Sequence, residues 1–512
     1  MVTHSAEPRN DGPLVSFVAL RPSAARVRSL QLALSSQQRW ELVLVGAEGV
    51  ETVADTRLVH VPADVGVPFS IAVSRGVAAA GGTFVSVLPE NGLPSSDALA
   101  TIDDWLLRTP DASVVYTDES SVRRDGGIEV VRKQGPAPER LRCQFYFGDL
   151  LLFRRDLLEG LGGFSDGIDG AELYDFTLRA SRSGAVVLHI PRVLFDAPAV
   201  REIGAFAPVS LGAVRRVLET HLAATGGGTV LEVSADGVHE TIRPIHGAPL
   251  ISIVIPTQAR LGTPLEPGGA PHSYLLHALR GLVEKTTYEN FEVVLVVDSD
   301  PDAAVIDEAT RLLGDRLVIV DYDLPFNFAA KANRGVLNAV GEYILMLNDD
   351  VEIITPGWIE SLLSLAQLPG AGMAGCMLYY EDDTVQHGGH HYWMGSPTHI
   401  GLQVPRGEAG PEHAFEVERE VIGVTAACSL FPREVYLEVG GMTTLLPGAF
   451  NDVDFCLKVA ERGYRAYWTP RAELYHFESK TRDARVRAYE LETLGRRWRH
   501  RLHQPQYWPF PE

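Results

Sequence analysis

The sequence has no long apolar run, which limits how the chain can meet a membrane. No stretch of about eighteen apolar residues occurs in it, whereas a helix that spans a bilayer needs about 20. The opening MVTHSAEPRNDG also lacks the apolar core of a signal peptide. We therefore expect neither a spanning helix nor a signal peptide, and residues 1–11 are predicted to form a frayed tail.

Cysteines and basic residues are scarce. The four cysteines are scattered, so we expect no disulfide framework and a reducing, cytoplasmic setting. With 45 Lys and Arg against 66 Asp and Glu, the net charge is −21. Such a charge repels a phosphate backbone and argues against nucleic acid as a partner. The 512 residues, 46% of them hydrophobic, predict a globular protein of two or three domains.

From residue 250 onward, strand patterns alternate with helical ones. LISIVIPT, FEVVLVVDSD, LVIVDYD and EYILML indicate strands, and NFAAKANRGVLNAV indicates a helix. This alternation predicts an α/β fold with a parallel, doubly wound sheet. Ligands bind such sheets at the carboxyl ends of the strands. Asp298 and the pair Asp349 and Asp350 stand at such ends.

The first third of the chain repeats this order. RWELVLVGAEG aligns with NFEVVLVVDSD, and PFSIAVSRGVAAAGGTFVSVLPENGL aligns with PFNFAAKANRGVLNAVGEYILMLNDDVEI. Two copies of one fold are therefore predicted, over residues 12–200 and 248–485. A connector helix and hairpin are predicted for 201–247, and a basic, aromatic helix or tail for 486–512.

The two copies differ at the polar positions that follow their strands. At five of these positions the second copy has an aspartate or a histidine and the first copy has another residue type. The aligned pairs are Asp298 with Gly46, Asp349 with Glu90, Asp350 with Asn91, Asp452 with Leu173 and His476 with Asp196. A solvated turn at a strand end gives no reason for this difference. A single active site in the second copy does.

Five segments together resemble a family 2 glycosyltransferase of the GT-A fold. They are IPT, VVLVVDSD, YILMLNDDVEI, GAFNDVDFCLKVAERGYR and LYHFESKTR. The likeness is to the O-antigen and cell-wall enzymes of the rhamnosyltransferase-like group, and it covers nearly the whole chain. In that group a degenerate GT-A copy often precedes an active one. The resemblance therefore implies two tandem GT-A (nucleotide-diphospho-sugar transferase, Rossmann-like) domains, the first non-catalytic.

The resemblance also implies a metal site. NDD fits the Asp-x-Asp motif of the family, with Asn348 in its first place. Asp350 would bind Mn²⁺ or Mg²⁺, Asp349 would help to hold ribose or sugar, and His476 would be a second metal ligand. The alternatives are a strand-end turn for the two aspartates and a packed or surface histidine.

The family pattern places the donor nucleotide near five more residues. Asp298 would accept the imide N–H of a pyrimidine base, which favours a UDP- or dTDP-sugar; capping of the next helix, in competition with Asp300, is the alternative. Thr257 and Arg260 would touch the nucleotide. Lys331 and Asn333 could reach the donor or lie on the solvated face of a helix.

Catalytic and diphosphate contacts are implied further along the chain. In FNDVDF, Asp452 matches the family's catalytic base for an inverting transfer, whereas Asp454 has a counterpart in the first copy and is interpreted as structural. Arg482 could pair with the diphosphate. His387, in QHGG, is a weak candidate near the donor sugar.

The stretch QHGGHHYW also suggests zinc bound by His387, His390 and His391. We reject that hypothesis because adjacent histidines diverge and because no cysteine or fourth ligand has a fitting spacing.

The predicted function is an inverting, metal-dependent glycosyltransferase that moves a sugar, by best guess rhamnose, to a surface or cell-wall glycan or a lipid-linked glycan. One rival is a nucleotidyltransferase, although IPTQARLGT supplies only Arg260 as a phosphate-binding cation. The other is an inert GT-A scaffold or glycan-binding protein. The basic tail could lie on the inner face of the cell membrane or close the catalytic domain as a packed helix. The sequence sets no oligomeric state.

Overall fold

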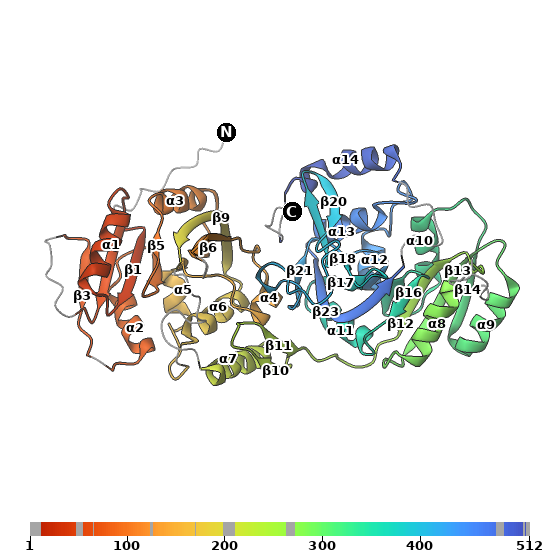
Figure 1. Ribbon diagram of the computed structural model, residues 1–512, viewed down its shortest axis with the longest axis horizontal. Helices are drawn as coiled ribbons and strands as arrows, with labels where there is room; N and C mark the ends of the chain where they lie inside the picture. Colours follow the sequence, from red (N-terminus) through yellow and green to blue (C-terminus); the bar gives the residue numbers. More distant parts are fainter. Residues whose placement is uncertain are drawn as a thin grey trace. The chain divides into compact units, whose positions relative to one another are not determined.

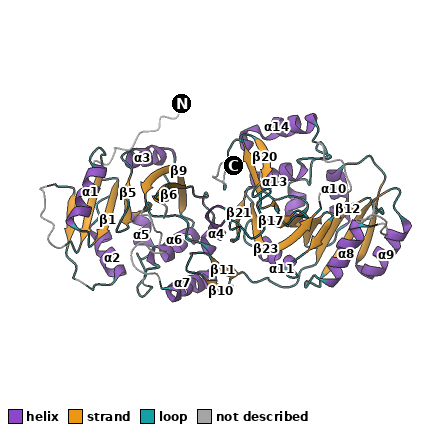
Figure 2. Cartoon of the chain, in the orientation of Figure 1, coloured by secondary structure: helices purple, strands orange, loops and turns teal. Residues whose placement is uncertain are grey.

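The computed structural model divides the chain into two compact units, Met1–Thr241 and Ile242–Glu512 (Figure 1). It describes residues 12–47, 55–64, 66–122, 126–168, 170–197, 210–262, 272–477, 486–504 and 507. Each unit is a sheet with helices packed on it (Figure 2).

The second unit is built on a mixed sheet with the strand order β14-β13-β12-β15-β22-β17-β23-β16, to which β18 and β21 are added at β17 and β23. Its strands are β12 (Ile251–Thr257), β13 (Phe291–Asp298), β14 (Leu317–Tyr322), β15 (Tyr343–Leu347), β16 (Val351–Ile353), β17 (Ala371–Tyr379), β18 (Val385–His387), β21 (Arg419–Val421), β22 (Cys428–Pro432) and β23 (Arg465–His476), with a separate hairpin of β19 (His390–Trp393) and β20 (Ser396–His399). Its α-helices are α8 (Tyr274–Glu284), α9 (Ala303–Leu313), α10 (Phe328–Asn338), α11 (Trp358–Ala366), α12 (Arg433–Glu438), α13 (Asn451–Glu461) and α14 (Ala488–Leu502).

The first unit has the same sheet, in the order β3-β2-β1-β4-β8-β6-β9-β5, with β7 added at β6. Its strands are β1 (Val15–Leu20), β2 (Trp40–Val45), β3 (Leu58–Val61), β4 (Phe84–Leu88), β5 (Leu93–Pro94), β6 (Ala112–Val122), β7 (Ile128–Val131), β8 (Leu151–Arg154) and β9 (Val186–Asp196). Its helices are α1 (Ala24–Leu34), α2 (Phe69–Ala79), α3 (Ala98–Arg108), α4 (Pro138–Cys143), α5 (Arg155–Gly160), α6 (Glu172–Arg182) and α7 (Leu211–Ala224); α7 and the hairpin β10 (Thr229–Val233) and β11 (His239–Ile242) occupy the predicted connector.

The two strand orders correspond position by position, which confirms the prediction of two copies of one α/β fold. The prediction of a purely parallel sheet is wrong. β12, β13, β14 and β15 are parallel, but β22 runs antiparallel between β15 and β17. The alternation of apolar residues shows that a segment is a strand, but it carries no information on the direction of that strand in the sheet.

Both copies use the same device to seat a helix closely on the sheet. Gly335 of α10 lies against Val254 and Val296, where any Cβ would collide with their methyl groups. Gly76 of α2 lies in the same way against two valines of β1 and β2. These glycines bring α10 and α2 within contact of two neighbouring strands, so the side chains of α10 are held firmly beside the strand ends.

The C-terminal helix α14 closes the second unit. Its apolar side packs Leu494, Trp498 and Leu502 into one cluster with residues of α13. The fully buried carboxylate of Asp454 accepts hydrogen bonds from Arg497 Nε at 2.6 Å and from Trp498 Nε1 at 2.7 Å. Of the two alternatives for the tail, the closing helix is therefore the one that the structure shows. None of the described helices is long and apolar enough to cross a bilayer.

Candidate active site

Strand register builds a carboxylate–histidine pair at the end of β15. Asn348, Asp349 and Asp350 form the link from β15 to β16, and Val351 of β16 pairs with His476 of β23. The backbone N–H of Phe477 also donates to the carbonyl oxygen of Asp350 at 2.9 Å. As a result His476 Nε2 lies 3.2 Å from Asp350 Oδ1, with both side chains buried.

The hydrogen bonds of His476 set its tautomer. Gln386 Nε2 donates to the backbone oxygen of His476 at 3.2 Å, so Gln386 Oε1, 2.7 Å from Nδ1, accepts the Nδ1 proton. In the neutral ring, Nε2 then carries a lone pair that faces Asp350 and the Asn348 amide nitrogen, which lies 3.0 Å away. An imidazole lone pair beside a carboxylate oxygen is a donor set that fits a divalent cation, and Gln386 is the outer-shell partner that such a ligand needs.

Asp349 points to the other side of this link. Thr257 Oγ1 donates to Asp349 Oδ2 at 2.6 Å and accepts from the backbone N–H of Ala259 at 2.9 Å. Burial, and after it the charge of Asp350, raise the pKa of the Asp349 carboxyl to about 6. The end of the strand thus concentrates negative charge in a place where water is excluded, and a bound cation would relieve that charge.

This raised pKa leads to a prediction about stability. A carboxyl whose folded-state pKa lies above the unfolded value destabilises the fold as it ionises, so stability is lost as the pH rises towards 6 and beyond. We expect Asp349→Asn to raise the thermal unfolding midpoint of the metal-free protein at about pH 7.5, by an amount corresponding to about 3 kcal/mol. The gain should shrink towards pH 4. Asp307→Asn, on the exposed face of α9, is the matched control and should change little; equal midpoints for both variants would contradict the assignment.

Lys331 ties two strand ends together beneath this link. Its ammonium group donates to the backbone oxygen of Thr257 at 2.7 Å and to Asp298 Oδ1 at 2.8 Å. Lys331 is buried, so the alternative of a solvated helix face is wrong for it. Asp298 does not cap α9, because Asp302 holds the N-cap position of that helix. Thr257, Lys331, Asn348, Asp349 and Asp350 line one small cleft at the end of the sheet.

Of the predicted donor contacts, Arg260, Asp298, Asn333 and His387 do not line this cleft. Arg260 is exposed and pairs with Asp300 at 2.9 Å. Asn333 is used structurally: its Oδ1 accepts from Tyr436 Oη at 2.6 Å and from the backbone N–H of Met442 at 2.9 Å. Its Nδ2 donates to the backbone oxygen of Met442 at 2.8 Å, so both hydrogen-bonding groups of the Asn333 side chain are engaged away from the cleft, and we propose no donor contact for it. Arg482 lies outside the described residues.

Asp452 lies in an adjoining pocket of about 300 Å³. It follows Phe450, whose left-handed backbone (φ 60°) directs the chain into α13. The Asp452 carboxylate accepts from the backbone N–H of Val453 at 2.8 Å and from that of Ala426 at 3.3 Å. The pocket shares Phe328 and Asn348 with the cleft, and its other polar lining includes Gln386, His390, Thr398, His399, Thr425, Asn451 and His476.

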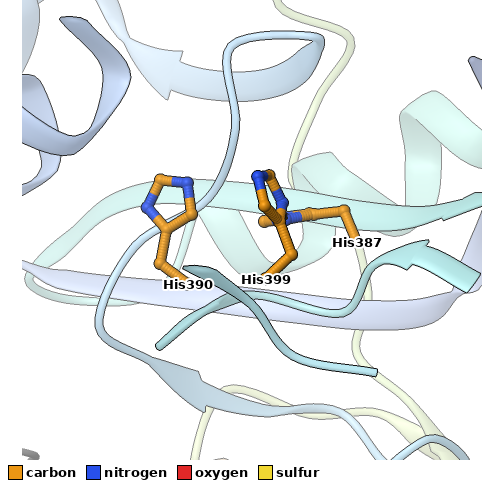
Figure 3. Close-up of side chains that lie close together, drawn as sticks. All are labelled: His387, His390 and His399. Atoms are coloured by element: carbon orange, nitrogen blue, oxygen red, sulfur yellow. Dashed lines mark hydrogen bonds between the residues drawn. The ribbon is translucent and has the colours of Figure 1, made fainter. Parts of the chain in front are cut away.

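Two histidines of this pocket, His390 and His399, form a group with His387, and Figure 3 shows the three side chains close together. The nitrogens of His387, His390 and His399 that could bind a metal lie within 4.8 Å of one another. His391, which the rejected zinc hypothesis included, is not part of this group. His399 takes its place because the hairpin register pairs it with His390. No sequence spacing marks His399, so sequence reasoning missed it.

The hydrogen bonds of this group oppose a metal ion. The backbone N–H of Thr425 donates to His387 Nε2 at 3.2 Å, so the proton of the neutral His387 ring is on Nδ1. Nδ1 then donates to His399 Nδ1 at 2.6 Å. A metal-bound histidine gives the lone pair of one nitrogen to the metal and donates a hydrogen bond from the other. In His387 the only lone pair, on Nε2, already accepts from Thr425. Burial lowers the pKa of His387 well below its usual value. Burial also lowers the pKa of His390, to about 4, although the nearby Asp452 carboxylate acts to raise it. Both rings are therefore neutral near pH 7.

Comparison with known proteins places this geometry in a family. Residues 269–489 match the family model described as "Glycosyltransferase like family 2", a span that includes Asp349, Asp350, Asp452 and His476. The match covers most of the second unit. The resemblance that the sequence motifs indicated is thereby confirmed, and the α/β unit that carries the charged strand ends is the glycosyltransferase domain.

Two relatives extend beyond the glycosyltransferase domain. The protein y4gI of Sinorhizobium fredii is 32% identical over 536 aligned positions, covering 98% of this chain and 58% of that protein. The O-antigen biosynthesis protein RfbC of Myxococcus xanthus is 31% identical over 420 positions, covering 81% of this chain and 32% of that protein. The chain thus spans between a third and three fifths of the length of these relatives.

The structural likenesses are weak. The mannosyltransferase PcManGT from Pyrobaculum calidifontis, solved with GDP-Man and Mn²⁺, is 15% identical, with 50% of this chain and 62% of that chain covered and a TM-score of 0.33. GalNAc-T7, solved with UDP, GalNAc and Mn²⁺, is 11% identical, with 54% and 52% covered and a TM-score of 0.40.

Proposed function

We propose that the glycosyltransferase domain is an inverting, metal-dependent enzyme that transfers a sugar from a UDP- or dTDP-linked donor to a glycan of the cell surface or cell wall. The observation that carries this proposal is the pairing of Asp350 with the oriented lone pair of His476, beside a pocket that holds Asp452. The O-antigen role of RfbC supports the class of acceptor.

The donor side of the proposal uses the cleft at the end of β15. Asp350 and His476 would hold Mn²⁺ or Mg²⁺, which would offset the charge that develops on a departing diphosphate. Asp349 and Thr257 would hold the ribose or sugar. Asp298, fixed by Lys331 at the end of β13, would accept the imide N–H of uracil or thymine. Rhamnose is the sugar we favour, on the resemblance alone.

The acceptor side uses the pocket that contains Asp452. His390 Nε2 lies 3.9 Å from Asp452 Oδ2, too far for a hydrogen bond. When one hydroxyl oxygen makes two hydrogen bonds of about 2.8 Å, the two atoms that it bonds lie about 4 Å apart, which matches this distance. An acceptor hydroxyl therefore fits between them, donating its proton to Asp452 and accepting from the neutral His390 ring. Asp452 would take that proton as the hydroxyl attacks, which is general base catalysis.

The first unit lacks this arrangement. In the second unit three residues link β15 to β16, whereas in the first unit four residues, Pro89 to Gly92, link β4 to β5. Strand register sets Asp196 where the second unit has His476, because Leu93 pairs with Asp196 as Val351 pairs with His476. Counted from β4, Asn91 takes the place of Asp350; counted from β5, Gly92 does, and neither is a carboxylate.

Arg26 lies at the corresponding place in the first unit, where it lines a cavity of about 870 Å³ together with Glu90, Gly92 and Asp196. Its guanidinium donates to the backbone oxygens of Gly92 at 2.5 Å and of Pro89 at 3.1 Å. A fixed cation therefore lies beside Glu90 at this strand end of the first unit, where the second unit has Asp350 and His476. We infer that the first unit is non-catalytic and serves as a scaffold or a glycan-binding domain.

The geometry does not favour a nucleotidyltransferase. The residue that would have to meet a triphosphate, Arg260, turns to Asp300 on the surface instead of into the cleft.

The deciding experiment measures donor hydrolysis across a panel of UDP- and dTDP-sugars with Mn²⁺, Mg²⁺ or EDTA. We expect one donor to be cleaved slowly in a metal-dependent way, and cleavage to accelerate when a lipid-linked glycan acceptor is added. If no donor is bound or cleaved with either metal, with or without that acceptor, the inert scaffold becomes the better account.

A further inference from the structure

We propose that a patch formed by the β19–β20 hairpin tip and the exposed side of α14 docks on an anionic membrane surface. This hairpin–helix patch consists of Trp393, Met394, Arg496, Arg499 and His503. The glycosyltransferase domain would then face a lipid-linked acceptor with its pocket beside the bilayer. The link to the acceptor rests on the proposed function, but the docking itself does not.

The hairpin tip and the end of α14 are neighbours in space, as Figure 1 shows for β20 and α14. Gly395, in the turn of the hairpin, lies directly against the imidazole ring of His503. Arg499 and Arg496 are four and seven residues before His503, so they project from the same side of the helix. The two arginines are exposed, with 71% of the Arg496 side chain accessible. Apolar and basic groups thus meet on one surface.

The hairpin tip carries an apolar residue that the local backbone disfavours. Met394 and Gly395 form the two-residue turn, and both have left-handed backbones, with φ of 49° and 86°. Such turns favour Asn or Asp before Gly, because a larger side chain is strained there. Met394 is nevertheless 80% exposed and Trp393 is 43% exposed. Neither folding nor solubility explains a methionine here, whereas insertion among lipid headgroups does.

The patch is basic, whereas the chain as a whole is acidic. Residues 487–503 contain five arginines and two glutamates in a chain of net charge −21. One of those glutamates, Glu490, is buried and accepts from the backbone N–H groups of Gly448 and Ala449 at 2.8 and 2.9 Å. With Glu490 buried, the exposed side of the helix remains basic, although Arg496 pairs with Glu492 and Arg497 pairs with Asp454. Each arginine near an anionic surface adds electrostatic attraction to it.

Most of the apolar side of helix α14 is not available to a membrane, although Tyr489 and Leu491 near its start are 44% and 48% exposed. Its apolar side is already covered by α13 through Leu494, Trp498 and Leu502. A helix that lay in the membrane on that side would have to leave the domain and break the contacts of Asp454. The hairpin tip is what adds apolar side chains to a helix that remains docked.

The acceptor pocket opens beside the patch. Pro397, Thr398 and His399 of β20 line that pocket, and so does Val486, which is 48% exposed and precedes α14. A sugar attached to a membrane lipid could therefore enter the pocket while its lipid stayed in the bilayer.

Vesicle flotation of the full chain tests the proposal. The protein is mixed with phosphatidylcholine vesicles with or without phosphatidylglycerol, in the absence of donor and metal. We expect flotation with the anionic vesicles, weakened by salt, and little with the neutral ones. Trp393→Ser with Met394→Asn, and separately Arg496→Gln with Arg499→Gln, should each reduce the floated fraction about tenfold. Met394→Asn creates an Asn-Gly turn and should leave the unfolding midpoint unchanged or higher.

Matched controls come from the first unit. Leu32 and Ile128 are 76% and 74% exposed, and Arg108 pairs with Asp104 as Arg496 pairs with Glu492. Two double variants serve as controls and should float like the wild type. The apolar control is Leu32→Ser with Ile128→Ser, and the basic control is Arg28→Gln with Arg108→Gln. Asp452→Asn should also float normally, which separates docking from catalysis. No flotation of the wild type, or equal loss in patch and control variants, overturns the proposal; with no flotation, a protein partner becomes the better occupant.

Discussion

Asp350→Ala is expected to lower metal-dependent donor hydrolysis and sugar transfer at least about a thousandfold. Asp350 Oδ1 lies 3.2 Å from His476 Nε2, and the Gln386 amide holds the lone pair of that nitrogen towards the carboxylate. Alanine leaves the imidazole as the remaining member of the pair, so cation affinity should fall together with turnover. Mn²⁺ titration by calorimetry measures the first effect, and donor hydrolysis measures the second.

A matched control for this change is Asp323→Ala. Asp323 follows β14 in the same sheet, but 74% of its side chain is exposed and it pairs loosely with Arg334 at 3.4 Å. We expect this variant to keep wild-type metal affinity and turnover. If Asp350→Ala binds Mn²⁺ as the wild type does and still turns over donor, the cation site is not at the end of β15.

Asp452→Asn is expected to lower kcat for transfer about a thousandfold or more while donor binding stays within about twofold. Asparagine is nearly isosteric, and its one side-chain oxygen can still accept from the backbone N–H of Val453, so the start of α13 should be kept. The longer hydrogen bond from the backbone N–H of Ala426, at 3.3 Å to the other carboxylate oxygen, would be lost. It cannot take a proton from an acceptor hydroxyl. The cleft around Asp349 and Asp350 is untouched, so nucleotide affinity should be preserved.

The measurement is single-turnover transfer to a glycan acceptor, alongside nucleotide binding with Mn²⁺. Glu461→Gln, at the other end of α13 with 47% of its side chain exposed, is the control and should transfer normally. A loss of nucleotide binding in Asp452→Asn equal to its loss of transfer would assign Asp452 to the donor site. Full activity would remove it from the mechanism.

Much of the site could be found in the sequence because apolar strands that end in charge are local patterns. The segments predicted as strands from residue 250 onward are strands in the structure, and the repeat in the first third reappears as the same strand order. The comparison of the two copies was the strongest sequence signal. It separated the positions that both copies keep for the fold from the positions at which only the second copy has a charged residue or a histidine.

Other parts of the site depend on contacts between distant residues. Asn333 and Lys331 are two residues apart on α10, yet the structure sends the first towards Met442 and the second to the strand ends. Helical periodicity predicts which residues share one side of α10. The packing of Gly335 against Val254 decides which residues of the sheet that side contacts. His399 joins His387 and His390 through hairpin register and not through any motif.

The sequence by itself determined the two-copy α/β architecture and the charged strand ends of the second copy, since both are set by local alternation of apolar and polar residues. The tertiary structure alone decided that His476 meets Asp350, that Lys331 is buried and that α14 closes the domain. Strand register and helix packing join groups that are far apart in the chain, and the free energy of those contacts is absent from any local segment.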